Sequence, residues 1–208
     1  MITIIDYGMG NLRSVQKALE RLGYEAKITD SAKDALDASH VILPGVGAFG
    51  AAMANLEKLK LIEPIRQVAA SGRPFLGVCL GMQLIMSESE EQGTFAGLDL
   101  IRGKVLRFFQ RPDRNAVTNV LKVPHMGWNS LHIRKPCPIL RDTPEGGMVY
   151  FVHSYYPSPE EDVAAATTDY GVEFCSVICK DNIMAAQFHP EKSGAIGLAM
   201  LKRFAELS

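Results

Sequence analysis

The stretch Pro74-Phe75-Leu76-Gly77-Val78-Cys79-Leu80-Gly81-Met82-Gln83 joins an apolar run to a helical pattern through a cysteine between two glycines. Residues 74–78 predict a buried strand, and the pattern from Met82 predicts a helix. The glycines permit a tight, strained turn that presents the Cys79 side chain at the carboxyl edge of a sheet. Unpaired N–H groups at a helix start favour a thiolate, so Cys79 is a candidate nucleophile. The alternative is an inert cysteine that fills space beside glycines needed for packing.

The rest of the first half alternates short apolar runs with helical repeats. Helices are expected at 12–22, after Asn11 as N-cap and before Gly23 as the stop, and at 49–61. Further strands are expected at 2–5, 24–29 and 40–43. Continuously apolar strands separated by helices indicate a parallel sheet covered on both faces.

The second half reads as strands without intervening helices, followed by one closing helix. The strands are expected at 103–109, 128–133, 148–155, 163–168, 174–180 and 183–188, and the helix near 197–207. The fold class expected is therefore α/β: a single domain over residues 1–208, with a central, mostly parallel sheet flanked by helices and antiparallel strands in the C-terminal half.

Composition excludes several classes of protein. The 208 residues hold 22 Lys and Arg against 23 Asp and Glu, a net charge of −1, which lacks the electrostatic footprint of a nucleic-acid or membrane-surface binder. No apolar run reaches the ~18 residues of a spanning helix, and the first residues do not resemble a signal peptide. The four cysteines form no C-x-x-C pair and are too sparse for a secreted scaffold. We expect a cytoplasmic protein without metal or cofactor.

A thiolate nucleophile needs a base, and His189-Pro190-Glu191 offers one. Proline disfavours helix at the residue before it, so His189 is expected in an extended conformation. Residues two apart in an extended chain point the same way, which puts Glu191 beside His189. The carboxylate could then hold one ring nitrogen while the other faces the thiol. The alternative is a hydrogen-bonded turn histidine without a catalytic role.

Acyl chemistry also needs hydrogen-bond donors for a tetrahedral oxyanion. The N–H of Leu80, directly after the nucleophile, is one candidate. Pro44-Gly45-Val46-Gly47 ends a neighbouring strand, and its small residues let backbone N–H groups approach a ligand closely. The alternative is an ordinary glycine-rich turn between strand and helix.

Three of these segments together resemble the class I glutamine amidotransferases. They are Pro-Gly-Val-Gly at 44–47, Gly-Val-Cys-Leu-Gly-Met-Gln at 77–83 and Gln-Phe-His-Pro-Glu at 187–191, in matching order and spacing across nearly the whole chain. Three more resemble the glutaminase subunits of histidine biosynthesis within that family: Asp-Tyr-Gly-Met-Gly-Asn-Leu at 6–12, Pro-His-Met-Gly-Trp-Asn at 124–129 and Phe-Val-His-Ser-Tyr at 151–155.

The resemblance implies a reaction and a set of roles. Cys79 would attack the side-chain amide of L-glutamine, and His189, oriented by Glu191, would protonate the departing ammonia and activate water against the glutamyl thioester. The resemblance assigns oxyanion donation to Val46 and Leu80, and glutamine binding to Gly47, Gln83, Ser154 and Tyr155. Without it, Gln83 is a polar position in a first helical turn, and Tyr155 is an aromatic strand residue.

The resemblance also implies a heterodimer. The family's glutaminase docks on a (β/α)₈-barrel cyclase subunit and passes it ammonia, from which the cyclase makes imidazole glycerol phosphate and aminoimidazole carboxamide ribotide. This chain has no phosphate-binding P-loop and no length for a second barrel, so that chemistry would belong to another chain. The candidate interface residues are Asn11, Trp128, Tyr150 and Lys192. A buried core position is the alternative for Trp128, the only tryptophan.

Three rival functions stay open from the sequence. A glutaminase for another synthase, such as one forming anthranilate or pyridoxal phosphate, is disfavoured by the segment at 124–129. A cysteine peptidase or deglycase is disfavoured by the position of the segment at 187–191 near the end of the chain. A non-catalytic regulatory relative would normally have lost Cys79 or His189. Selective alkylation of Cys79 separates this last function from the enzymes.

Overall fold

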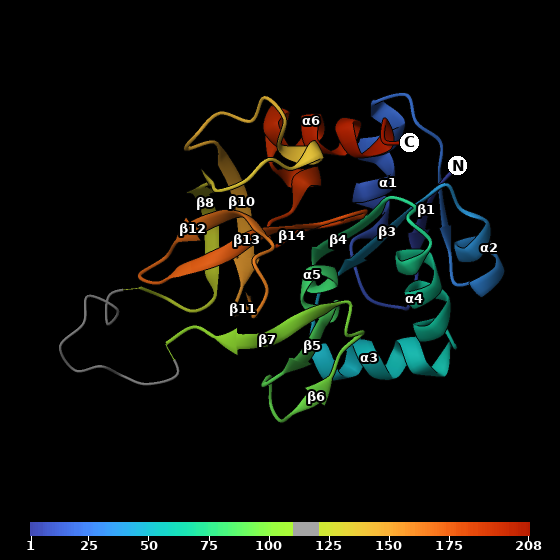
Figure 1. The fold of residues 1–208 in the computed structure, drawn as a ribbon, viewed down its shortest axis with the longest axis horizontal. Coiled ribbons are helices and arrows are strands. Elements are labelled where there is room, and N and C mark those ends of the chain that lie inside the picture. Colours follow the sequence, from blue (N-terminus) through green and yellow to red (C-terminus); the bar gives the residue numbers. More distant parts are fainter. Residues whose placement is uncertain (110–120) are drawn as a thin grey trace.

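The central feature of the computed structural model is an eight-stranded sheet in the order β2-β1-β3-β4-β14-β13-β12-β9. The structure describes residues 1–109 and 121–208 (Figure 1). The parallel part of the eight-stranded sheet consists of β1 (Ile2–Ile5), β2 (Ala26–Thr29), β3 (His40–Gly45), β4 (Phe75–Cys79) and β14 (Ile183–Ala186). Antiparallel pairing then adds β13 (Glu173–Lys180), β12 (Ala164–Asp169) and β9 (His132–Ile133). The α/β class with antiparallel strands in the C-terminal half is confirmed.

Helices cover both faces of this sheet (Figure 1). One face carries α1 (Leu12–Arg21) and α6 (Gly194–Ala205); the other carries α2 (Ala32–Asp37), α3 (Phe49–Lys58), α4 (Ile62–Ala70) and α5 (Leu80–Leu84). Successive strand residues point to opposite faces, so Ile4 packs with the α1–α6 side and Ile5 with the α2–α5 side. Among the described residues, no helix is long and apolar enough to cross a membrane.

The described part of the chain also forms two smaller sheets. A four-stranded sheet has the order β11-β7-β5-β6, and a two-stranded sheet pairs β8 with β10. Their bounds are β5 (Met86–Ser89), β6 (Phe95–Ala96), β7 (Ile101–Arg107), β8 (His125–Ser130), β10 (Met148–His153) and β11 (Tyr155–Pro159). Short 3₁₀ helices span η2 (Pro138–Leu140) and η3 (Pro190–Lys192).

The structure differs from several expected elements. Helices α2 and α4 and strands β5 and β6 were not expected, and the helix predicted at 49–61 ends at Lys58. The helix after Cys79 stops at Leu84, because Met86 begins a strand beside β7. The strand expected at 148–155 breaks at Ser154 into β10 and β11, which belong to different sheets. Local hydrophobic patterns do not reveal such a change of pairing partner, because both strands remain extended and apolar.

Close packing of α5 against β3 makes Gly81 irreplaceable. A Cβ at position 81 would lie 1.7 Å from the carbonyl oxygen of Leu43, which is backbone and cannot rotate away. We expect Gly81→Ala to lower the free energy of unfolding by ~3 kcal/mol or more, measured by urea titration. Gly72→Ala is the matched control: its φ is +80° but nothing lies within 4 Å of the added Cβ, so the loss stays near the ~1–2 kcal/mol of backbone strain. Equal losses in the two variants would contradict this account.

Candidate functional site

Cys79 lies at the strained junction of β4 and α5. Its φ of 54° and ψ of −109° lie outside the conformations that side-chain-bearing residues favour, as expected for the predicted strained turn at residues 77–81, which we call the elbow. Both flanking glycines are needed here: a Cβ on Gly77 would approach the Gly81 carbonyl oxygen to 2.9 Å, and one on Gly81 would strike β3. The turn therefore fixes the thiol at the carboxyl edge of the sheet.

His189 and Glu191 come to the same edge because β14 pairs with β4, with Ala186 opposite Val78. His189 has the extended backbone expected before proline, with φ −99° and ψ 99°. Its Nδ1 lies 2.8 Å from Glu191 Oε1, and the two side chains are 3% and 1% exposed. Nε2 is buried and has no hydrogen-bond partner among the described residues, which leaves this nitrogen available to act on the thiol.

The charge state of His189 follows from its neighbours. Burial by itself lowers the pKa of an imidazole, but interactions with Cys79 and then Glu191 outweigh it and raise the pKa of His189 to about 10. The ring is therefore an imidazolium at neutral pH, next to the Cys79 sulfur. Such a pair is the resting state that a cysteine nucleophile needs.

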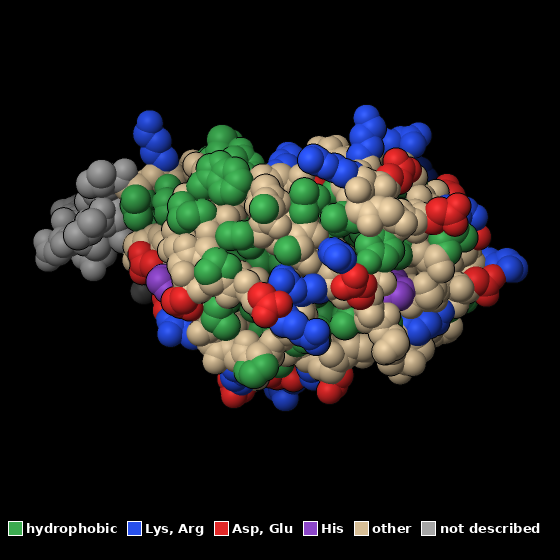
Figure 2. All heavy atoms as spheres, turned by 90° about the horizontal axis from the view of Figure 1, so that it is seen from above, with side chains coloured by type: hydrophobic (Ala, Val, Ile, Leu, Met, Phe, Trp, Pro, Cys, Tyr) green, Lys and Arg blue, Asp and Glu red, His purple; other side chains and the backbone are tan. Residues whose placement is uncertain are grey.

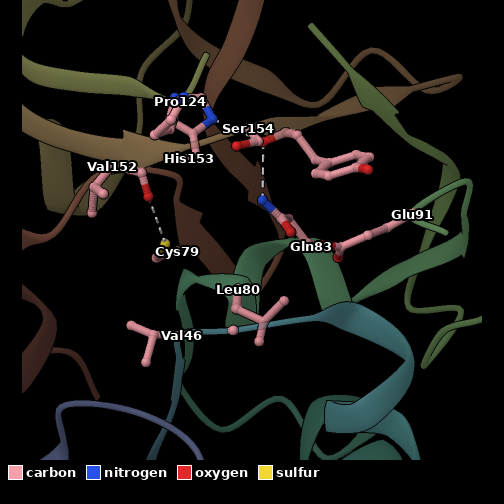
Figure 3. Close-up of a pocket in the computed structure, with 11 residues that line it drawn as sticks. Val46, Cys79, Leu80, Gln83, Glu91, Pro124, Val152, His153 and Ser154 are labelled. Atoms are coloured by element: carbon pink, nitrogen blue, oxygen red, sulfur yellow. Dashed lines mark hydrogen bonds between the residues drawn. The ribbon is translucent and has the colours of Figure 1, made fainter.

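A cavity of ≈ 300 Å³ opens over Cys79 (Figure 3). This size is at the lower end of small-molecule sites and suits a compact substrate. It is lined by Val46, Gly47, Cys79, Leu80, Gln83, Glu91, Pro124, Val152, His153, Ser154 and Tyr155. Every residue expected from the sequence to bind substrate or an oxyanion thus lines one cavity. Among the described residues, no group of three or more His, Cys, Asp or Glu is placed to hold a metal ion.

The two expected oxyanion donors, Val46 and Leu80, lie on one side of Cys79 (Figure 3). The β10 backbone lies on the other side of Cys79. Gly47 has a φ of +108°, a backbone conformation that residues with a side chain rarely adopt, so glycine is favoured at this position. A Cβ on Gly45 would lie 2.0 Å from the Tyr7 hydroxyl. A side chain therefore does not fit at position 45 and is disfavoured at position 47, while the Val46 side chain is 41% exposed.

Two side-chain amides connect the cavity to the nucleophile. Gln83 Nε2 donates to the Tyr155 carbonyl at 3.0 Å and to Gln187 Oε1 at 3.1 Å. Gln187 Nε2 in turn lies 3.8 Å from Cys79 Sγ and donates to it. Gln187 was not predicted as a site residue, although it begins the segment at 187–191 that contains His189 and Glu191.

Glu91 is a second candidate site residue that was not predicted from the sequence. It follows β5, accepts a hydrogen bond from the Phe49 N–H at 2.8 Å, and lines the cavity. A carboxylate in this position can bind a cationic group of a ligand. No sequence motif surrounds it, so only the packing of the β5 loop against α3 identifies it.

A pair of buried histidines flanks the cavity. His125 Nδ1 and His153 Nε2 are 3.0 Å apart, and His153 Nδ1 lies 2.8 Å from the Tyr155 carbonyl. Burial lowers the pKa of His125 to about 4. It also lowers the pKa of His153, to about 3, more strongly than the carbonyl contact raises it. Both rings are therefore neutral at pH 7.

The expected interface residues lie on the surface around β8, β10 and η3. Trp128 is 53% exposed, which excludes a buried core position, and its ring packs edge-on to Tyr150 with 6.1 Å between centroids. Met126 and Met148 are 62% and 46% exposed on the same two strands, and hydrophobic side chains gather on this side of the molecule (Figure 2). Lys192 and Asn11 are exposed, at η3 and at the N-cap of α1.

A family model described as "Glutamine amidotransferase class-I" matches residues 3–207. A curated relative from Geobacter sulfurreducens is 55% identical over 99% of this chain and 98% of its own length. Another, from Methanocaldococcus jannaschii, is 49% identical over the full length of both proteins. Each is named "Imidazole glycerol phosphate synthase subunit HisH".

Solved structures share the fold at low sequence identity. One described as a glutamine amidotransferase has a TM-score of 0.74 at 17% identity and covers 100% of both chains. A structure of PurLQS from Thermotoga maritima has a TM-score of 0.70 at 18% identity, covering 98% of this chain and 94% of its own. These two support the class I amidotransferase fold.

The imidazolium at position 189 is expected to control the reactivity of Cys79. We expect His189→Asn to slow alkylation of Cys79 by iodoacetamide at pH 7 about tenfold or more, because an unassisted thiol is only a few per cent thiolate at this pH. Mass spectrometry of the Cys79 peptide measures the rate. The Cys179 peptide is the internal control, because Cys179 is partly exposed and does not line the cavity. An unchanged Cys79 rate would contradict the assignment.

The histidine pair predicts acid lability. The pKa values of His125 and His153 are lowered on folding from 6.5 to about 4 and about 3, so the unfolded chain binds more protons below pH 6.5. Stability is therefore lost as the pH falls, by about 2 kcal/mol for each ring between about pH 6.5 and 5. We expect His153→Gln to reduce the loss between pH 7 and 5 by about 2 kcal/mol, measured by urea unfolding. Equal losses in variant and wild type would contradict a neutral His153.

Proposed function

Because the chain belongs to the class I glutamine amidotransferase family, we propose that Cys79, His189 and Glu191 hydrolyse L-glutamine to glutamate and ammonia. The chain is a glutamine amidotransferase subunit of imidazole glycerol phosphate synthase and serves histidine biosynthesis. The observation that supports the triad is the buried His189–Glu191 pair, with Nε2 unbonded, beside the strained Cys79.

Acylation begins with attack of the Cys79 thiolate on the side-chain amide carbon of glutamine. The carbonyl oxygen becomes an oxyanion, which the N–H groups of Leu80 and Val46 stabilise. The His189 imidazolium then gives its proton from Nε2 to the amide nitrogen, the carbon–nitrogen bond breaks, and ammonia leaves. The products of this step are ammonia, a glutamyl thioester on Cys79 and a neutral His189.

Deacylation uses the same groups in the opposite order. Neutral His189 takes a proton from water at Nε2 while the water oxygen attacks the thioester carbon. Collapse of the second oxyanion releases glutamate and returns the thiolate, facing an imidazolium again. Glu191 holds Nδ1 throughout at 2.8 Å, so the ring keeps one orientation and its positive charge stays paired.

The remaining cavity groups match the two ends of an amino acid. Glu91 would pair with the α-ammonium group, because it brings a carboxylate to the lining of the cavity. The backbone N–H groups of Ser154 and Tyr155 would hold the α-carboxylate. Gln83 and the backbone of Gly47 would position the side chain of the glutamine substrate. This arrangement would select an L-amino acid with a side-chain amide reaching Cys79.

The partner would be the (β/α)₈-barrel cyclase subunit, docked as a heterodimer over β8, β10 and η3. Exposed Met126, Trp128 and Met148 supply apolar contacts. A hollow of ≈ 370 Å³ lined by Lys17, Arg21 and Lys192 borders Glu191 and suits acidic side chains of a partner. The four cysteines are free, which fits a reducing, cytoplasmic location for the complex.

The first experiment measures glutamate release from glutamine by the purified chain, alone and with the cyclase subunit and its nucleotide ligand. We expect release in the complete mixture and little without the partner, because free hydrolysis would waste ammonia. Cys79→Ala is expected to abolish release while leaving ammonium-dependent synthesis by the complex intact. No release from the complete wild-type mixture would contradict the proposed function.

Glu91→Gln tests the proposed contact between the Glu91 carboxylate and the α-ammonium group of glutamine. Loss of the carboxylate removes a charge-assisted contact to the α-ammonium group, so we expect KM for glutamine to rise about tenfold or more with a smaller change in kcat. Glu88→Gln is the matched control, because Glu88 pairs with Lys104 on the surface and its loss should leave KM unchanged. A fall in kcat at constant KM would contradict this role.

Trp128 reports docking directly, since it is the only tryptophan in the chain. Its exposed ring is expected to become buried in the complex, so titration with a cyclase subunit that lacks tryptophan should shift its emission to shorter wavelengths. We expect Trp128→Ala to weaken binding by ~2 kcal/mol, about thirtyfold in Kd, as central aromatic residues do. Phe95→Ala, at an exposed residue on β6, serves as the control. Unchanged emission at saturation would place the interface elsewhere.

A further inference from the structure

An unbroken series of hydrogen bonds leads from β8 to the nucleophile, and its two histidines have no role in the reaction described above. It begins at Asn129 on β8, passes through His125 and His153, and reaches the carbonyl of Tyr155. From there Gln83 and Gln187 continue it to Cys79 Sγ. Its members come from β8, β10, β11, α5 and the segment after β14.

The chemistry of each partner fixes where the protons lie. A backbone carbonyl only accepts, so His153 must carry its proton on Nδ1, which faces Tyr155 O at 2.8 Å. In a neutral ring Nε2 is then an acceptor, and His125 must donate to it from Nδ1 at 3.0 Å. His125 Nε2 in turn accepts from Asn129 Nδ2 at 3.2 Å, whose other hydrogen goes to the Asp169 carbonyl at 2.8 Å.

Aromatic rings hold the pair in this arrangement. His125 is stacked between Tyr170 and Phe151, with centroids 4.0 and 4.8 Å away, both at 24° between planes. Phe108 packs edge-on against both histidines, at 6.2 and 5.1 Å. His125 and His153 are 3% and 6% exposed. Both rings therefore have little contact with solvent, and within residues 1–109 and 121–208 each ring nitrogen has one hydrogen-bond partner.

The hydrogen-bond partners also determine the orientations of the Gln83 and Gln187 side-chain amides. The Tyr155 oxygen accepts from Gln83, so Gln83 must present its NH₂ group there, and the second hydrogen of that group goes to Gln187 Oε1. Gln187 therefore turns its own NH₂ group, and not its oxygen, toward the sulfur. A reversed Gln187 amide would place a partly negative oxygen against a thiolate.

We propose that His125 and His153 are positioning residues for glutamine hydrolysis: they hold the Tyr155 carbonyl where it sets the Gln83 and Gln187 amides so that Gln187 donates to the Cys79 sulfur. The inference rests on the proposed function and adds His125, His153 and Gln187 to the residues that it uses. Asn129, the first residue of the series, directly follows Trp128 in β8. The series of hydrogen bonds therefore runs from the strand that would contact the cyclase subunit to the nucleophile.

The test compares His153→Leu, which removes both hydrogen bonds, with His153→Gln, which retains a donor and an acceptor. In the complex with the cyclase subunit and its nucleotide, His153→Leu should lower kcat for glutamate release about tenfold or more. KM for glutamine should change by less than about threefold, and His153→Gln should recover most of the loss. His132→Leu, at a partly exposed histidine bonded to Glu145, is the control and should match wild type.

A double-mutant cycle separates positioning from a general loss of structure. If His153 acts through Gln187, then His153→Leu combined with Gln187→Leu should be no slower than Gln187→Leu alone. Losses that multiply would mean that His153 supports the fold only, and would overturn the proposal. If wild-type complex releases glutamate while His153→Leu matches it, the positioning role fails and the proposed function stands. If the wild-type complex releases none, the proposed function itself fails.

One measurement needs no variant. Nitrogen-15 NMR of histidine-labelled protein at pH 7 should show, for both rings, a protonated Nδ1 and an unprotonated Nε2. The opposite tautomer in either ring, or an imidazolium, would break the direction of the series and overturn the proposal, whatever the stability of the substituted proteins.

Discussion

The site depends on the close approach of α5 to β3, where Gly81 lies against the carbonyl of Leu43 without room for a side chain. This contact forces the chain to leave β4 through the strained backbone of Cys79. The thiol is consequently held at the edge of the sheet, where β3 and β14 deliver the 44–47 segment and His189. A looser turn would let Cys79 relax to an ordinary conformation and withdraw the sulfur from both.

Burial makes the charge of each histidine at the site depend on its hydrogen-bond partners. The same low exposure has opposite consequences for histidines with different partners: His189, facing Cys79 and Glu191, has a raised pKa, whereas the pKa of His153, facing a carbonyl and a neutral ring, is lowered. One ring is therefore an acid at neutral pH and the other a fixed hydrogen-bond donor and acceptor. Both states follow from the partners and not from the residue type.

Much of the fold was predictable because its strands are short, apolar and separated by helical repeats. β1 was predicted at its observed bounds, and the elbow follows from two glycines around one cysteine. Helix α2 and strand β6 were missed because short elements depend on tertiary contacts for their stability. The break at Ser154 was missed because the two halves of one extended run pair with β8 and β7, which are remote in the sequence.

The sequence by itself determined the strained elbow, the extended His-Pro-Glu segment and the family to which both belong, since these depend on neighbouring residues and on glycine and proline stereochemistry. Only the tertiary structure decided which side chains surround the sulfur. Glu91, Gln187, His125 and His153 reach the cavity or its lining through strand pairings and loop contacts between distant segments. Their protonation and amide orientation depend on buried partners, which no local pattern of residues encodes.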